Sequence, residues 1–239
     1  MELSRSKDYA DERTKSLVNA VLAAMLRFFV HRLDTTRAND RGSNYLFEST
    51  ESIGIASNLA FSPSAEPTAV TGSADPRAAK ATKTKSAAQP RAEKSAKVKP
   101  ERDYLERALQ LDCANFLRVS LAGTVRMEQN DVSGGRADIV VEHHGVRLII
   151  EVKREDHNAS HEELRKRYSA QASEYSNTNT RIGLMLVLDR SRKDGTSGDL
   201  EEKFSVQTVT KVGDTEPRTL IFAVMPGKRK RPSELQLRE

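Results

Sequence analysis

The sequence has little cysteine and few aromatic residues, and it contains no tryptophan. A single cysteine, Cys113, in 239 residues excludes an internal disulfide framework and any cysteine-cluster metal site. Such cysteine usage is typical of a reducing compartment, so we expect a cytoplasmic protein. Apolar residues make up 37% of the chain, less than the roughly 45–50% of an average globular chain. We therefore expect part of the chain to stay outside any core.

A long uncharged apolar run is also lacking. The most apolar stretch, residues 17–30, is interrupted by Arg27 and is shorter than the roughly 20 residues that a membrane-spanning helix needs. Charged residues precede it and no small-residue cleavage pattern follows it, which argues against a signal peptide. We expect no membrane partner.

Composition divides the chain into several parts. Residues 1–61 contain a predicted helix at 8–33, which we expect to serve self-association as a homodimer or docking to a protein partner. Residues 62–100 are rich in Ala, Ser, Thr, Pro and Lys and predict a disordered basic linker, because such a chain cannot offset its conformational entropy by burial. Two roles are open for this linker: a solvated tether and a phosphate-binding arm. Residues 101–226 predict a folded domain, and residues 227–239 a basic tail.

Positive charge is in mild excess, with 39 Lys and Arg residues against 34 Asp and Glu residues and a net charge of +5. That balance suits a polyanionic partner, and we expect DNA. The run Lys228-Arg229-Lys230-Arg231 follows Pro226-Gly227. We expect it to contact phosphates, with a localisation-type run and a solvated tail as alternatives.

The third part predicts an α/β fold with a mixed β-sheet flanked by helices. Pro100 precedes a helix at 101–121, and Ser160 is the expected N-cap of another at 160–176. Glycine-containing turns separate the strands between these helices. Apolar runs predict strands at 124–127, 137–141, 146–152, 182–188, 204–212 and 219–224.

Polar residues gather at one end of the hairpin formed by the second and third strands. Side chains two apart on a strand share a face, so Glu151 and Lys153 point the same way. Antiparallel pairing through the turn at 143–145 places Asp138 opposite them. The two carboxylates, the backbone carbonyl of Val152 and waters would form an oxygen-rich site for Mg²⁺, with Mn²⁺ as an alternative. Lys153 would assist the nucleophile or the transition state, so the pattern predicts metal-dependent phosphodiester hydrolysis.

Asp138 followed by Glu151-x-Lys153 resembles the PD-(D/E)xK nuclease superfamily. A helix before the strands and the Gly134-Gly135 turn before Asp138 strengthen the resemblance, whereas Ala137 stands where the superfamily has its leading proline. The resemblance covers about residues 101–190 and implies a restriction-endonuclease-like fold.

On the following helix, Gln171-x-x-x-Tyr175 is similar to the glutamine-tyrosine motif of the exonuclease-like branch of this superfamily. The resemblance implies that Gln171 lies near the metal and helps to position the catalytic residues Asp138, Glu151 and Lys153.

The first helix of this superfamily often supplies one more acid to the metal. Glu101, Glu106 and Asp112 are the candidates here. Asp112 falls in the middle of the apolar face, where a carboxylate is costly unless something pairs with it, so we expect Asp112 to be a metal ligand. The alternative is that Asp112 pairs with an arginine and that Glu101 only complements the helix dipole.

The sequence thus predicts a Mg²⁺-dependent deoxyribonuclease, with a role in defence, in mobile elements or in repair implied by the resemblance alone. Two other functions stay open: a nuclease-like module that binds DNA or scaffolds a complex without catalysis, and a nuclease directed at RNA. Endonucleolytic and exonucleolytic action are not distinguished.

Overall fold

The structure is a computed structural model, and one compact unit of it, formed by Met1–Ser49 and Lys99–Glu239, carries all of the fold below. The second unit, Thr50–Val98, and with it nearly all of the predicted linker, lies outside the described residues. The described residues are 2–34, 43–47, 100–132, 135–175, 180–191, 199–210 and 216–229.

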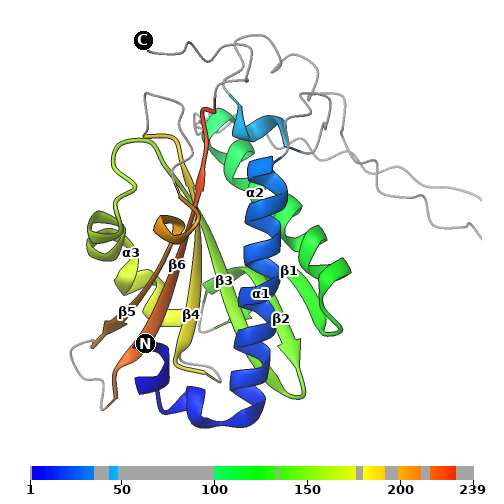
Figure 1. Ribbon diagram of the computed structural model, residues 1–239, viewed down its shortest axis with the longest axis vertical. Helices are drawn as coiled ribbons and strands as arrows, with labels where there is room; N and C mark the ends of the chain where they lie inside the picture. Colours follow the sequence, from blue (N-terminus) through cyan, green and yellow to red (C-terminus); the bar gives the residue numbers. More distant parts are fainter. Residues whose placement is uncertain are drawn as a thin grey trace, which may run out of the picture. The chain divides into compact units, whose positions relative to one another are not determined.

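Six strands form one mixed sheet in the order β1-β2-β3-β4-β6-β5 (Figure 1). The first three strands are an antiparallel meander, β3, β4 and β6 run parallel, and β5 is antiparallel to β6. The α/β class and the mixed sheet with flanking helices are therefore confirmed. The strands span Thr124–Val132 (β1), Gly135–His143 (β2), Val146–Glu155 (β3), Ile182–Asp189 (β4), Phe204–Val209 (β5) and Arg218–Pro226 (β6).

The parallel strands β4 and β6 lie side by side in the interior of the sheet and are buried along their whole length. A continuous apolar run is what a strand covered on both faces requires, and it is the signal that predicted β4 from the sequence. The connection from β3 to the parallel strand β4 passes through α3 (His161–Tyr175), as a parallel pair demands.

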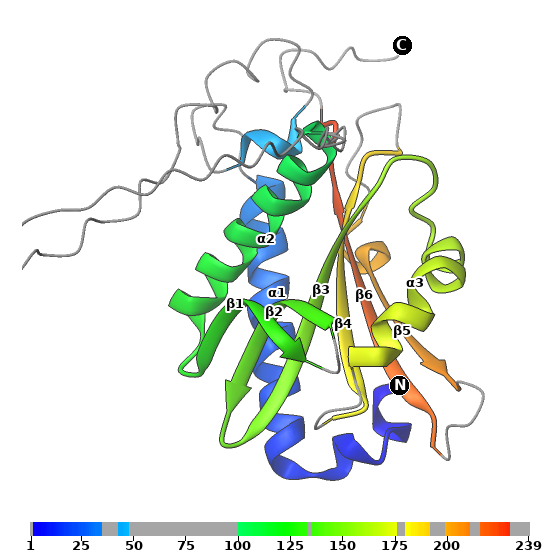
Figure 2. The ribbon, with the colours of Figure 1, turned by 180° about the vertical axis from the view of Figure 1, so that it is seen from behind.

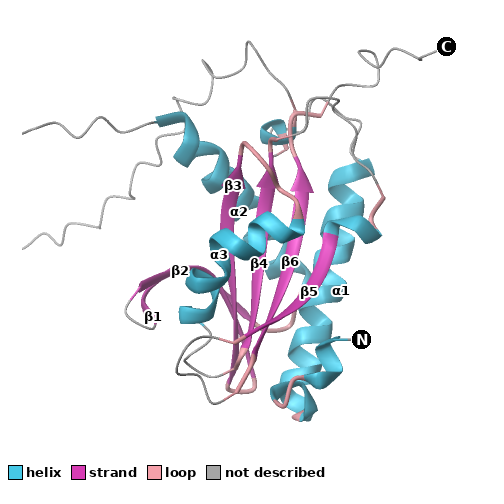
Figure 3. Ribbon diagram, turned by 90° about the vertical axis from the view of Figure 1, so that its left-hand side faces the viewer, coloured by secondary structure: helices cyan, strands magenta, loops and turns pink. Residues whose placement is uncertain are grey.

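Two helices cover one face of the sheet and one helix covers the other. Residues of α1 (Glu12–Asp34) and α2 (Pro100–Ser120) share a core with alternate strand residues such as Ile150 and Val152. Leu164 of α3 belongs to a second core with Met185 and Phe222. Figure 2 shows α2 lying along α1, and Figure 3 shows α3 across the opposite face.

Helix α1 is part of this domain. Asp11 caps it, since its Oδ2 accepts hydrogen bonds from the backbone N–H and the hydroxyl of Thr14, each at 2.8 Å. Phe29 packs against Phe204 with ring centroids 4.7 Å apart. We expected a separate segment whose apolar face serves association or docking. That face is instead covered by the chain's own sheet, because the sheet needs an apolar layer there.

By length and composition alone, α1 would also pass as a membrane-crossing helix. Its apolar face, including Val21 and Met25, is buried in the core that it shares with the sheet. A core helix of a globular domain has the same composition, so this property carries no membrane assignment.

The beginning of the predicted basic tail is tied to the domain. Arg229 donates hydrogen bonds of 2.7 Å to the carbonyls of Arg32 and Leu33 at the end of α1, and its guanidinium lies over the ring of Phe47. Burial lowers the pKa of Arg229. We expected this run to contact phosphates, but Arg229 caps the carboxyl end of a helix. Residues 230–239 lie outside the described residues.

Candidate active site

The antiparallel ladder between β2 and β3 stops where the predicted site begins. Paired residues run from His143 opposite Val146 to Ile139 opposite Ile150. One step further, the Oδ2 atom of Asp138 accepts a hydrogen bond of 2.8 Å from the backbone N–H of Val152. A side chain thus takes the place of a backbone acceptor. The two strands separate there, and Asp138 is held beside the Glu151–Lys153 segment.

Glu151 is buried next to this point, with 3% of its surface exposed. Its Oε1 accepts a hydrogen bond of 2.9 Å from Nζ of Lys153. Burial, followed by the charge of Asp138, raises the pKa of Glu151 to about 7, although Lys153 acts in the opposite direction. Two carboxylates therefore lie close enough to repel one another in a desolvated place, which is a setting that favours a bound cation.

Lys153 remains a cation in this environment. Burial acts to lower the pKa of its ammonium group, but the charge of Glu151 and the hydrogen bond to it outweigh burial, so the pKa is raised. The charges of Asp138 and Glu106 act in the same direction. With 18% of its side chain exposed, Lys153 can offer positive charge to a group that approaches the site.

Helix α2 reaches the site through residues one turn apart. Nε2 of Gln110 donates a hydrogen bond of 2.8 Å to the carbonyl of Asp138. Glu106, four residues earlier, lies near enough for its charge to raise the pKa values of Glu151 and Lys153. Of the two candidate acids of α2 whose side chains the structure describes, Glu106 and Asp112, Glu106 is therefore the one that lies near the site.

Asp112 binds Arg32 and Tyr45, which corrects our expectation that it is a metal ligand. Its carboxylate forms an ion pair with Arg32 and accepts a hydrogen bond of 2.7 Å from the hydroxyl of Tyr45. Burial and then the charge of Asp112 raise the pKa of Tyr45. Asp112 lies six residues after Glu106, so it faces α1 and not the site. The apolar face that pointed to Asp112 is the face that packs against α1, and the arginine alternative is the correct one.

Gln171 lies on α3, and its side chain is outside the described residues, as is that of Glu101 on α2. The backbone gives one indication for Gln171. Ile150 and Val152 belong to the core under α1 and α2, so the alternating Glu151 and Lys153 lie on the face that α3 covers. The role of Gln171 stays a prediction.

The described residues contain no set of three His, Cys, Asp or Glu side chains arranged to hold a metal. A magnesium site does not need three, because Mg²⁺ keeps several waters and binds through one or two carboxylates. Asp138 and Glu151 fit that requirement. The N–H and the C=O of a strand residue point to the same side, so the carbonyl of Val152 is also directed towards β2 and Asp138.

A pocket of about 270 Å³ lies apart from these residues, at the carboxyl ends of β4 and β6. Its lining includes two buried side chains of opposite charge, Lys203 and Asp189, together with His161 and Ser191. None of Asp138, Glu151 and Lys153 lines it. We place the chemistry at the carboxylates, because a mixed lining of this kind does not define a ligand class.

The sequence did not predict the contacts that three residues make at or beside the site: Gln110 with the carbonyl of Asp138, and Glu155 with Arg167. The alternation of Glu151, Lys153 and Glu155 along one strand was the signal for Glu155. The partner of Glu155, Arg167, lies 12 residues away on α3 and has no local signature.

Comparisons with known proteins return no match: no family model, curated protein or solved structure is significantly similar to this chain.

Proposed function

We propose that the protein is a metal-dependent nuclease that hydrolyses DNA phosphodiester bonds, with a restriction-endonuclease-like fold and a site of the PD-(D/E)xK type. The observation that carries the proposal is the grouping of Asp138, Glu151 and Lys153 at the point where β2 and β3 separate. The strongly raised pKa of Glu151 adds to it, since perturbed carboxylates cluster at functional sites.

Asp138 and Glu151 would hold the metal, with the carbonyl of Val152 as a third oxygen ligand and Glu106 as the nearby acid of α2. A bound Mg²⁺ would polarise the scissile phosphate and lower the pKa of a water molecule at the site. The hydrogen bond from Val152 orients Asp138 before any metal binds. Lys153 places a cation where negative charge increases on the phosphate oxygens during the reaction.

DNA as the substrate rests on the resemblance and on the mild positive charge of the chain. The test is cleavage of linear, circular and single-stranded DNA, and of single-stranded RNA, with Mg²⁺ or Mn²⁺. Wild type is compared with Lys153→Ala and with Lys15→Ala, which removes the same charge from α1 on the opposite face of the sheet. We expect Lys153→Ala to lower the cleavage rate by about 100-fold or more and Lys15→Ala to leave it unchanged.

Equal cleavage by the two lysine variants would exclude this site. Cleavage of RNA alone would change the substrate class, and cutting of circular DNA would establish endonucleolytic action. Salt-sensitive DNA binding by all three proteins without any cutting would favour the DNA-binding module over the enzyme.

A further inference from the structure

Lys153 stands between two carboxylates on one strand. Glu151 and Glu155 are each two residues away from it, so all three side chains leave the same face of β3 and the two acids are about equally distant, at roughly 7 Å along the strand. The Nζ atom of Lys153 nevertheless binds only one of them, Glu151, at 2.9 Å. Spacing along the strand does not explain that choice.

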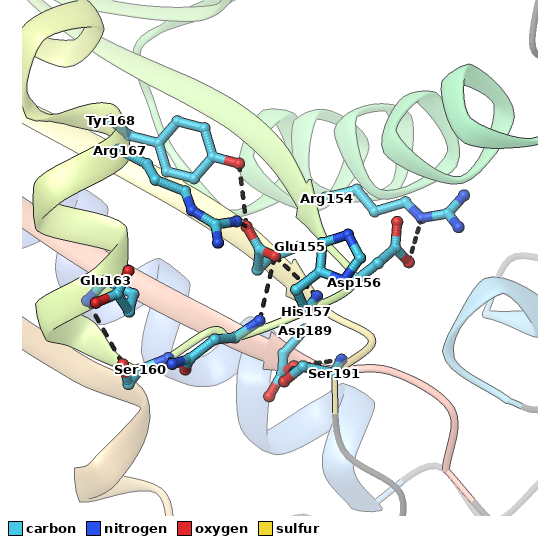
Figure 4. Close-up of polar contacts among 11 residues, drawn as sticks. Arg154, Glu155, Asp156, His157, Ser160, Glu163, Arg167, Tyr168, Asp189 and Ser191 are labelled. Carbon is cyan, nitrogen blue, oxygen red and sulfur yellow. Dashed lines mark hydrogen bonds and ion pairs between the residues drawn. The ribbon is translucent and has the colours of Figure 1, made fainter.

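Glu155, which is 2% exposed, accepts hydrogen bonds from four other donors. Its Oε1 accepts hydrogen bonds from the backbone N–H groups of His157 at 2.8 Å and Asn158 at 3.3 Å. Its Oε2 accepts hydrogen bonds from Nη1 of Arg167 at 2.6 Å and from the hydroxyl of Tyr168 at 3.3 Å. Figure 4 shows Arg167 and Tyr168 of α3, and His157 of the turn before α3, converging on the carboxylate. Both oxygens are therefore occupied.

Without Arg167, Glu155 would compete for Lys153. Its carboxylate is 2% exposed and forms an ion pair with Arg167. Removing one partner of such a pair leaves a buried charge without compensation. Lys153, two residues away on the same face of β3, carries an ammonium group that could take the place of the lost cation.

We propose that Arg167 is a positioning residue for the active site: by occupying the carboxylate of Glu155, it keeps Lys153 directed to Glu151. The inference rests on the proposed nuclease function for its effect on catalysis. Its structural part, the choice of partner by Lys153, is independent of that function.

The test is a set of variants in the full-length protein. Arg167→Met removes the cation while its stem remains, and Arg167 is 41% exposed, so the fold should tolerate the change. We expect Mg²⁺-dependent cleavage of DNA to fall by about tenfold to a hundredfold, because Lys153 turns towards Glu155. Arg167→Lys restores most of the rate. Arg165→Met, an exposed arginine on the same helix, is the matched control and leaves the rate unchanged.

The double variant Glu155→Gln, Arg167→Met decides between positioning and a merely structural role. A neutral side chain at position 155 no longer competes for Lys153, so we expect the second substitution to recover most of the lost rate. If Arg167 only fastens α3 to β3, the double variant will be as impaired as Arg167→Met or more so, and the proposal is overturned.

A crystal structure of Arg167→Met provides a readout that needs no activity. We expect Nζ of Lys153 within hydrogen-bond distance of Glu155 and away from Glu151, and an unchanged Lys153–Glu151 pair would overturn the proposal. If wild type cleaves no nucleic acid, the nuclease function fails while this structural result still decides the partner of Lys153.

Discussion

The carboxylate of Asp138 accepts a hydrogen bond of 2.8 Å from the backbone N–H of Val152. It lies in the position where a continued ladder between β2 and β3 would have a backbone carbonyl. This single contact separates the strands and aligns a carboxylate with the Glu151–Lys153 segment. It is also a stability element, since it satisfies a buried N–H group. Structure and chemistry therefore depend on the same side chain.

Replacing Asp138 should separate those two roles. Asp138→Ala leaves the N–H of Val152 without its acceptor, and we expect the free energy of unfolding to fall by about 1–3 kcal/mol. Asp138→Asn keeps a carbonyl oxygen for that bond and should cost less than about 1 kcal/mol, yet it should abolish metal-dependent cleavage. Urea denaturation and cleavage assays on both variants measure this, and full activity of Asp138→Asn would contradict the site.

Glu151 predicts a dependence of stability on pH. Because its pKa is raised from 4.5 to about 7, the folded state binds more protons than the unfolded state between these pH values. The contribution of Glu151 to stability is therefore present at low pH and is lost as the pH rises through about 7. In EDTA at pH 8, we expect Glu151→Gln to be more stable than wild type by about 2 kcal/mol, since the burial of an ionised carboxylate is removed.

That difference should disappear near pH 4, where the carboxyl is protonated in both states. Denaturation of both proteins across this pH range measures it. Glu201→Gln, a change at an exposed glutamate, is the control and should follow wild type throughout. A wild type that is the more stable protein at pH 8 would refute the raised pKa.

Metal binding should reverse the order at pH 8. We expect Mg²⁺ at a hundred times its dissociation constant to stabilise wild type by about 2.7 kcal/mol, which exceeds the advantage of about 2 kcal/mol that Glu151→Gln has in EDTA. Glu151→Gln and Asp138→Ala should gain little, because each lacks one of the two carboxylates. Thermal unfolding with Mg²⁺ and with EDTA tests this, and equal stabilisation of all three proteins would place the metal elsewhere.

Two of the acids of α2, Glu106 and Asp112, should behave in opposite ways. Glu106→Gln should lower the rate of metal-dependent cleavage by about tenfold or more and leave stability within about 0.5 kcal/mol of wild type. Asp112→Asn breaks a buried ion pair with Arg32 and should lower the free energy of unfolding by about 3 kcal/mol.

Cleavage by Asp112→Asn, measured at a temperature where the variant is folded, should equal that of wild type. The reverse pattern, with activity lost in Asp112→Asn alone, would return the metal ligand to Asp112.

The strands and the core of the candidate site were predictable because their signals are local. Apolar runs and glycine turns predicted the meander and the buried strand β4, although β1 extends to Val132, five residues beyond the predicted end. Asp138, Glu151 and Lys153 are joined by one hairpin, so strand alternation and antiparallel pairing were enough to bring them together.

Contacts between distant segments could be learned only from the folded chain. Arg32 and Asp112 are 80 residues apart, and Arg229 reaches Arg32 across 197 residues. A helical pattern shows that a face is apolar, but it does not say which surface will cover it. The apolar face of α1 therefore looked like a docking surface, and Asp112 looked like a ligand, until the packing of α1 against α2 and the sheet assigned both to the interior and left Glu106 at the site.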